Sequence, residues 1–423
     1  MIKKTRHYRT QLAVVGAGFA GCAATVFALE RGIKTIQIGN TGALAYTSGY
    51  LDLLGVDNAK YLKNPWEGLK LLREKEPDHP YSRLSDQDIR NAFEEFISAL
   101  SQMGLSYTKP GTDNRIALLP AGACKPTYCL PETMQRSTVA MTSKAKVLII
   151  DFFGLEGFSA NEIVKNLSSA WPQLSARRIS FPEMETGAQV FPEVMARALE
   201  VRSTREIFAL RLKEVAGDAE YIAMPAILGI HKPDIIHLEM EQLTGLPIFE
   251  IPTIPPAVPG IRLRELFERQ LAARGATFIS QQKVKQVLLQ EETINLTLKD
   301  NFGPIEIKTD KLLIASGRFL SGGLQADQHQ VRESLLDLPV QQPGERDNWF
   351  NESYFDPAGH AINQSGLRVT DEFQPINEQG KVIDRRLYCA GILLANQDWV
   401  RQRCGAGLAI ATAYKAINAM TST

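Results

Sequence analysis

Residues 12–38 read LAVVGAGFAGCAATVFALERGIKTIQI, and this stretch decides the fold. The pattern predicts a buried strand at 12–15, a tight glycine turn at 16–21, a helix of small side chains at 22–31 and a second strand at 33–38. A strand, a crossover helix and a further strand form the βαβ unit of a parallel sheet. Strand and helix patterns alternate along much of the remaining chain, so we expect an α/β fold.

The turn after the first strand fits the pattern GxGxxG in the context, between a strand and a helix, where that pattern binds nucleotides. Gly16 permits the turn, Gly18 lets a phosphate approach the backbone, and Gly21 lets the helix pack closely on the strand. The helix N-terminus favours an anion. We therefore predict that six residues contact a nucleotide or flavin phosphate: Gly16, Ala17, Gly18, Phe19, Ala20 and Gly21. The alternative is a glycine turn that only packs the βαβ unit.

The second strand ends without the acid that dinucleotide sites usually place there to bind the adenosine ribose. Its last residues lead into Gly39-Asn40-Thr41-Gly42, which contains no carboxylate. A phosphate site without a ribose anchor suits FMN, which has one phosphate and no adenosine. An FAD site in which Asn40 or Thr41 replaces the acid fits as well, and this feature leaves the two alternatives open.

The C-terminal part favours a flavin over a nicotinamide. Residues 387–391 (LYCAG) predict a strand and turn, and residues 403–409 (RCGAGLA) predict a helix that opens with glycines. A helix N-terminus stabilises the anionic edge of a reduced flavin. These features predict a Rossmann-like flavoprotein of the two-dinucleotide-binding-fold type. Further flavin contacts are expected at Ser316, Gly317, Gly391, Gly405, Ala406 and Gly407.

The flavin-binding domain is expected to be discontinuous. Its first part is residues 1–55 and its second part is residues 256–423, with an inserted α/β domain at 56–255. A proline-rich crossing marks the end of the inserted domain. Two pairs in that domain have the capping-box spacing that starts a helix: Ser159 with Glu162, and Ser203 with Glu206.

Composition excludes several other classes of protein. The 423 residues are 44% hydrophobic, as in a packed globular chain. The 47 Lys and Arg residues balance 47 Asp and Glu residues, so no global field attracts a polyanion, and nucleic acid is not expected as a partner. Five scattered cysteines contain no CxxC pair, so we expect no metal site and a reducing compartment.

The N-terminus imitates a signal peptide or a short membrane anchor, because basic residues precede an uncharged run at 12–29. We prefer the βαβ interpretation, since the run contains three glycines with mechanical roles and a second strand follows it. No other stretch approaches the roughly 18 apolar residues that span a bilayer. We therefore expect a soluble, cytoplasmic protein.

Five blocks spread over the chain carry a family resemblance. They are 46–54 (YTSGYLDLL), 79–82 (HPYS), 252–256 (PTIPP) with 260–263 (GIRL), 315–324 (ASGRFLSGGL) and 370–372 (TDE). Together they resemble the B subunit family of anaerobic glycerol-3-phosphate dehydrogenase over essentially the whole chain. The first block adds Ser48 and Gly49 to the expected cofactor contacts. The sequence departs from the family at two places, with CGAG at 404–407 where members can carry CGGG, and with Arg318 where a small residue can occur.

The resemblance implies a role in the oxidation of sn-glycerol 3-phosphate to dihydroxyacetone phosphate, with electrons passed to a quinone or an anaerobic acceptor chain. It implies FMN as cofactor, with FAD as the alternative. It also implies two partners within the same complex, an FAD-containing catalytic protein (the A subunit) and a membrane-associated iron–sulfur protein (the C subunit). The chain would then be attached peripherally to the inner membrane through one of these partners.

Catalytic residues are harder to assign. His79 is a candidate general base, or a loop and capping residue before Pro80. Arg262 is a candidate phosphate clamp, or a surface residue of an amphipathic helix, and Arg318 is a candidate to face the cofactor. Two rival functions remain open, a self-sufficient FAD-dependent oxidoreductase of the fumarate-reductase kind and a non-catalytic flavin-binding electron-transfer protein. Whether the flavin of this chain accepts hydride or relays electrons is also open.

Overall fold

The computed structural model describes residues 4–184 and 189–421, and the chain divides into two compact units. Within the described residues, unit 1 is formed by 4–43, 52–96 and 267–421, and unit 2 by 44–51 and 97–266. Each unit contains a sheet with parallel strands and helices, so the predicted α/β class is confirmed.

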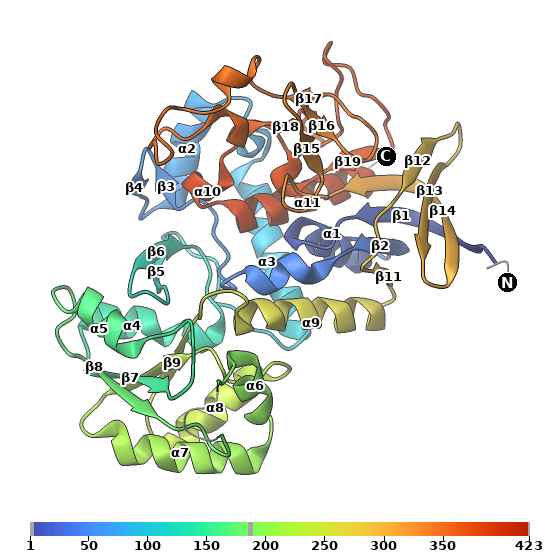
Figure 1. The fold of residues 1–423 in the computed structure, drawn as a ribbon. Coiled ribbons are helices and arrows are strands. Elements are labelled where there is room, and N and C mark those ends of the chain that lie inside the picture. The colour runs from blue at the N-terminus through green and yellow to red at the C-terminus, as the bar shows by residue number, and fades with distance from the viewer. Residues whose placement is uncertain (1–3, 185–188, 422–423) are drawn as a thin grey trace. The chain divides into compact units, whose positions relative to one another are not determined.

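Unit 1 is built on a seven-stranded sheet in the order β11-β2-β1-β14-β13-β12, with β19 paired to β14 beside β13 (Figure 1). Strands β11, β2, β1, β14 and β19 are parallel to one another, whereas β12 and β13 form antiparallel pairs with the strand that follows each. The strands are β1 (Arg6–Val15), β2 (Thr35–Gly39), β11 (Thr277–Ser280), β12 (Gln286–Leu289), β13 (Ile294–Asp300), β14 (Gly303–Ile314) and β19 (Leu387–Cys389).

The first strand and first helix lie at the centre of unit 1. Strand β1 pairs with β2 on one side and β14 on the other, and α1 (Phe19–Glu30) packs against α11 (Gly405–Thr421). The small side chains of α1 are buried from Ala20 to Ala28. The βαβ interpretation of the N-terminal region is therefore confirmed. Among the residues that the structure describes, no helix has the length and apolar character needed to cross a membrane.

Short elements complete unit 1. Two-stranded pairs are formed by β3 (Val56–Asp57) with β4 (Lys60–Tyr61), β15 (Leu324–Ala326) with β16 (Val331–Glu333), and β17 (Val340–Gln341) with β18 (Gly366–Leu367). The helices are α2 (Pro65–Lys75), the part of α3 (Asp86–Gln102) up to Phe96, the part of α9 (Val258–Ala273) from Phe267, and α10 (Trp399–Gln402).

The observed division of the chain differs from the predicted one at both ends of the insertion. Residues 56–96 lie in unit 1, and residues 256–266 lie in unit 2. Aromatic packing explains the first difference, because the ring of Phe96 lies 6.1 Å from that of Phe27 and 6.2 Å from that of Phe267. Such contacts join segments that are far apart in the sequence and therefore leave no local signal.

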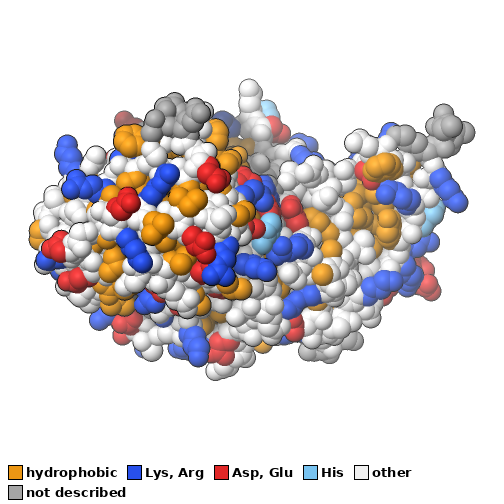
Figure 2. Space-filling view, turned by 90° about the horizontal axis from the view of Figure 1, so that it is seen from below, with side chains coloured by type: hydrophobic (Ala, Val, Ile, Leu, Met, Phe, Trp, Pro, Cys, Tyr) orange, Lys and Arg blue, Asp and Glu red, His pale blue; other side chains and the backbone are white. Residues whose placement is uncertain are grey.

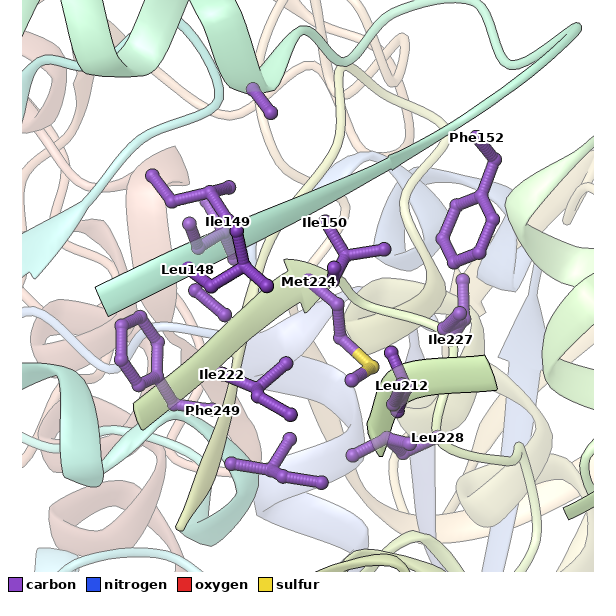
Figure 3. Packing of buried hydrophobic residues seen from close by; sticks show 14 of the residues in the cluster. Leu148, Ile149, Ile150, Phe152, Leu212, Ile222, Met224, Ile227, Leu228 and Phe249 are labelled. Carbon is purple, nitrogen blue, oxygen red and sulfur yellow. The ribbon is translucent and has the colours of Figure 1, made fainter. Parts of the chain in front are cut away.

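Unit 2 contains a four-stranded parallel sheet in the order β10-β9-β7-β8, and its core lies between this sheet and the helices (Figure 3). Ile150, Met224 and Leu212 are among the apolar side chains that fill this core. The strands are β5 (Arg115–Leu118) and β6 (Cys124–Thr127), which form a hairpin, and β7 (Val147–Phe152), β8 (Leu174–Ile179), β9 (Tyr221–Pro225) and β10 (Ile248–Ile251). The helices that lie wholly in unit 2 are α4 (Arg136–Ser143), α5 (Ala160–Leu167), α6 (Pro192–Ala198), α7 (Arg202–Ala216) and α8 (Pro233–Thr244).

Of the two predicted capping serines, Ser159 is confirmed as an N-cap and Ser203 is not. The Ser159 hydroxyl accepts a hydrogen bond from the Glu162 amide at 3.3 Å and begins α5. Ser203 lies inside α7, because that helix already begins at Arg202 after an extended Val201.

Surface charge agrees with the balanced composition. Figure 2 shows basic and acidic side chains interspersed on the visible face, without a large area of one sign.

Candidate flavin site

The carboxyl ends of β1 and β14 lie side by side in unit 1, with Val15 opposite Ile314. Because β2 flanks β1 on one side and β14 flanks it on the other, the strand order changes direction between β1 and β14. Open α/β sheets bind ligands at the carboxyl ends of the strands at such a point. We call residues 16–18 and 315–318, which follow the two strands, the switch-point edge.

The three glycines of the turn have different roles at the switch-point edge. Gly16 has a φ of +128°, and a Cβ there would lie 2.1 Å from the Ala315 carbonyl oxygen. A Cβ at Gly21 would lie 2.0 Å from the Gly16 carbonyl oxygen, so helix and strand pack as predicted. A Cβ at Gly18 would meet no heavy atom within 4 Å. Gly18 therefore faces open space, and a ligand can approach its backbone.

An anionic group fits this open side. Helix α1 begins at Phe19 after its N-cap Gly18, which has no side chain that could accept hydrogen bonds from the first-turn amides. The hydroxyl of Ser316 is buried and has no hydrogen-bond partner among the described residues. Amides at a helix N-terminus bind phosphate. These residues thus fit a flavin phosphate, with Gly18 and the first turn of α1 on one side and Ser316 on the other.

The end of β2 explains why the usual acid is missing. Gly39 has a φ of +154°, and a Cβ there would lie 2.9 Å from the Ala17 amide nitrogen, so a carboxylate side chain would require the turn to move. Asn40 is exposed, whereas Thr41 is buried and donates a hydrogen bond to the carboxylate of Glu268 on α9. Sequence reasoning missed Glu268, because 227 positions separate it from Thr41.

The glycines near the C-terminus serve packing within unit 1. The Gly391 amide donates to the Thr412 hydroxyl at 2.9 Å, and a Cβ at Gly391 would lie 2.6 Å from that of Ala20. The Gly407 amide donates to the Asp52 carbonyl at 2.8 Å, and a Cβ there would lie 2.3 Å from the Tyr81 hydroxyl. These contacts explain the glycines without a ligand, so the predicted flavin contacts of this group stay predictions.

Other predicted contacts fall in different places. A Cβ at Gly405 would lie 2.8 Å from the Trp399 ring, and Ala406 is half-buried beside it. Gly317 follows Ser316 at the switch-point edge with a φ of +69°. Ser48 and Gly49 belong to unit 2, where the Gly49 carbonyl accepts a hydrogen bond from the Tyr107 hydroxyl at 2.8 Å.

His79 lies in a fully buried position of unit 1. Its Nδ1 accepts a hydrogen bond from the Tyr81 amide at 3.0 Å, and its Nε2 lies 3.2 Å from the Gln402 side-chain oxygen. Burial lowers the pKa of His79 to about 4, against the opposing effect of the Gln402 hydrogen bond. A neutral ring with both nitrogens engaged suits the capping alternative better than the role of general base.

We expect His79 to make stability depend on pH. In the unfolded chain His79 is protonated below its ordinary pKa of 6.5, whereas in the folded chain it stays neutral down to about pH 4. The free energy of unfolding therefore falls as the pH falls from 6.5 to about 4. The loss reaches about 3 kcal/mol. Urea unfolding between pH 7.5 and pH 4 should show a smaller loss for His79→Gln than for wild type. A substitution of the exposed His329 by Gln is the control, and equal pH profiles for all three proteins would contradict this role.

Arg262 is part of a buried ion pair in unit 2. Its guanidinium donates to both Glu250 oxygens at 2.6 and 2.8 Å, and the two side chains are 1% and 0% exposed. The Glu250 carboxylate also accepts from the Ile227 and Leu228 amides at 2.8 and 2.6 Å. Although burial acts to raise it, the Arg262 charge keeps the pKa of Glu250 below its ordinary value. This arrangement gives Arg262 a structural role, and nothing in it favours the predicted phosphate clamp.

A mixed sheet whose parallel strands end in a switch-point edge with a glycine turn, a helix N-terminus and an unpaired hydroxyl defines a nucleotide-binding α/β protein. The model of one family, described as "FAD binding domain", matches residues 11–408. The chain belongs to this FAD binding domain family, and a flavin is therefore its cofactor.

Curated relatives support the family resemblance found in the sequence. The B subunit of anaerobic glycerol-3-phosphate dehydrogenase from Vibrio cholerae serotype O1 is 29% identical, over 99% of this chain and 97% of that protein. The protein of the same name from Aliivibrio fischeri is 27% identical, over 95% of this chain and 93% of its own length. Among solved structures, 3-ketosteroid delta1-dehydrogenase from Sterolibacterium denitrificans has a TM-score of 0.44 at 10% identity, covering 98% of this chain and 100% of that one.

Proposed function

We propose that this chain takes part in the oxidation of sn-glycerol 3-phosphate to dihydroxyacetone phosphate as the B subunit of a respiratory flavoprotein complex. The observation that carries the proposal is the nearly full-length similarity to proteins of that name, combined with a switch-point edge that fits a flavin phosphate. In this reaction the substrate loses a hydride from its secondary alcohol carbon and a proton from its hydroxyl, and a flavin of the complex would supply the hydride acceptor.

The residues of this chain have defined tasks in the proposal. Gly18 and the first turn of α1 bind the flavin phosphate, and Gly16 with Gly21 hold that turn against β14 and β1. Helix α11 packs on α1. We assign no catalytic base, since His79 is buried with both ring nitrogens engaged.

The partners are part of the proposal. We propose an FAD-containing A subunit and an iron–sulfur C subunit, with the complex attached to the inner membrane through a partner and electrons passed to a quinone or an anaerobic acceptor chain. The cysteine pattern suits this arrangement, because the five thiols are scattered and contain no cluster motif.

A direct test of the reaction uses the purified full-length chain with its flavin. We expect anaerobic sn-glycerol 3-phosphate to bleach the flavin absorbance of the chain if its own flavin accepts the hydride. If bleaching requires the FAD-containing partner to be added, the chain relays electrons, which is the non-catalytic alternative. No bleaching in the complete complex would contradict the proposed function.

We propose FMN rather than FAD as the cofactor, because Gly39 has no room for the ribose-binding acid. The FAD alternative is favoured by one observation, the carboxylate of Glu268 beside Thr41 at the same strand end. A hydrogen bond from the adenosine ribose to a carboxylate contributes about 1.5–3 kcal/mol to the binding free energy of FAD, which is a factor of about 10 to 100 in its affinity. The two cofactors therefore make different predictions for Glu268.

We expect Glu268→Gln to leave FMN affinity within about twofold of wild type, because FMN has no adenosine ribose to lose that contact. The wild-type chain should also bind FMN more tightly than FAD. Quenching of flavin fluorescence gives both dissociation constants, and Glu94→Gln, which changes an exposed acid of α3 in unit 1, is the matched control. Tight FAD binding that falls tenfold or more in Glu268→Gln alone would establish the FAD alternative.

A further inference from the structure

Arg318 is a buried cation without a counter-ion of its own. Its side chain follows β14 at the switch-point edge, and the residue is 7% exposed. One guanidinium nitrogen donates to the Ile362 and Ser365 carbonyls at 3.2 and 2.7 Å. No described carboxylate forms an ion pair with it within 4.0 Å. Its charge is therefore balanced only by the two carbonyl dipoles and by the Phe319 ring, whose centroid lies 5.7 Å from the guanidinium carbon.

The acid that acts on Arg318 electrostatically is already bound elsewhere. Asp398 accepts hydrogen bonds from Arg401 at 3.1 Å and from Asn363 at 3.3 Å. Burial lowers the pKa of Arg318 to about 10, and the effect of Asp398 in the opposite direction is smaller. Keeping this guanidinium buried therefore lowers the stability of the fold.

Arg318 and two serines that neighbour it each carry an unpaired polar atom. The Nε of Arg318 and the hydroxyls of Ser316 and Ser365 are buried and have no hydrogen-bond partner among the described residues. Both serines are neighbours of Arg318, because its guanidinium donates to the Ser365 carbonyl at 2.7 Å, and Gly323, whose amide donates to the Arg318 carbonyl at 3.0 Å, would place a Cβ 2.5 Å from the Ser316 hydroxyl. Unpaired buried donors are costly unless a ligand satisfies them.

The position of this cluster identifies the ligand chemistry. Ala315 and Ser316 lie against the glycine turn, because a Cβ at Gly16 would lie 2.1 Å from the Ala315 carbonyl oxygen and 3.1 Å from the Ser316 amide nitrogen, and Arg318 follows them two residues later. An anion with several acceptor oxygens satisfies a guanidinium N–H and hydroxyl donors at once.

We propose that Arg318, with Ser316, binds the phosphate monoester of a ligand at the switch-point edge. Two phosphate monoesters belong to the proposed function on which this inference rests, the 5′-phosphate of FMN and the phosphate of sn-glycerol 3-phosphate. Both molecules present the same dianionic phosphate, so we assign Arg318 and Ser316 to the binding of that phosphate. The experiment below identifies which of the two molecules carries it.

The test compares phosphorylated and unphosphorylated ligands on the full-length chain after its flavin has been removed. Comparing the affinity for FMN with that for riboflavin isolates the contribution of the flavin phosphate. Comparing the affinity for sn-glycerol 3-phosphate with that for glycerol isolates the contribution of the substrate phosphate, and this affinity is measured from the absorbance change of flavin that has been bound again to the chain. For Arg318→Gln we expect the affinity for one phosphorylated ligand to fall about 10- to 100-fold while its unphosphorylated partner is unaffected. The exposed Arg332 supplies the control variant, Arg332→Gln.

Ser316→Ala keeps the inference testable if Arg318→Gln folds poorly. The hydroxyl has no partner within the described structure, so its removal should leave the urea midpoint unchanged while the same phosphorylated ligand binds about 2- to 10-fold more weakly. The inference is overturned if Arg318→Gln and Ser316→Ala bind all four compounds within twofold of the Arg332→Gln control.

Failure of the proposed function is a separate outcome. If the wild-type chain binds neither FMN nor sn-glycerol 3-phosphate, inorganic phosphate becomes the probe, read as the rise in melting temperature at constant ionic strength. A rise that disappears in Arg318→Gln supports the Arg318 assignment even then, and the same rise in both proteins, or no rise in either, contradicts it.

Discussion

Replacing Gly18 by valine is expected to lower flavin affinity by about 100-fold or more while the chain stays folded. The backbone at Gly18 has a φ of −83° and a ψ of −168°, which valine adopts readily, and a Cβ there meets no atom within 4 Å. The added methyl groups would occupy the space through which the phosphate reaches the first-turn amides. Loss of two charge-assisted hydrogen bonds of about 1.5–3 kcal/mol each gives this magnitude.

The control for this experiment is the neighbouring glycine. Gly16→Val should destabilise the fold itself, because its φ of +128° and the Ala315 carbonyl at 2.1 Å from a Cβ exclude any side chain. Flavin absorbance of the purified proteins measures binding, and urea unfolding measures stability. Normal flavin content in Gly18→Val would mean that the phosphate binds elsewhere.

Replacing Arg262 by methionine should destabilise unit 2 by about 3–5 kcal/mol, the range seen when one partner of a buried ion pair is removed. The Glu250 carboxylate would remain fully buried with only the Thr133 hydroxyl and the Ile227 and Leu228 amides as donors. Hydrogen exchange of the β9 and β10 amides measures the loss locally. The loss should shrink at low pH, where protonation neutralises Glu250.

Arg264→Met is the matched control, because Arg264 lies on the same helix with a side chain 30% exposed and a weak contact of 3.6 Å to Glu265. We expect a change below about 0.5 kcal/mol there. Arg262→Met that keeps full stability yet loses affinity for sn-glycerol 3-phosphate would revive the phosphate clamp predicted from the sequence.

The local patterns of this sequence were sufficient for the α/β class and for the central βαβ unit. Strand β1, the glycine turn and α1 depend on residues within 30 positions of one another, and the roles of Gly16 and Gly21 as packing glycines follow from that local geometry. The capping residue Ser159 is local in the same sense. These predictions succeeded because the residues that cause the structure are close together in the chain.

Predictions that depend on burial or on distant partners could not be made in this way. Ser203 has the spacing of a capping residue, yet α7 begins one residue earlier. Arg262 sits on a helix with an amphipathic pattern, and only the fold shows that Glu250 neutralises it. Glu268 accepts a hydrogen bond from Thr41 after the end of β2, although 227 positions separate the two residues, and no sequence motif predicts that contact.

The central claim is that the switch-point edge binds FMN through Gly18 and the first turn of α1. The most direct measurement releases the cofactor from the purified full-length chain and identifies it by mass, in parallel with Gly18→Val. We predict about one FMN per chain in the wild type and almost none in the variant. A wild-type chain that yields no flavin, a wild type that yields FAD at full occupancy, or a Gly18→Val variant that retains FMN would contradict the account.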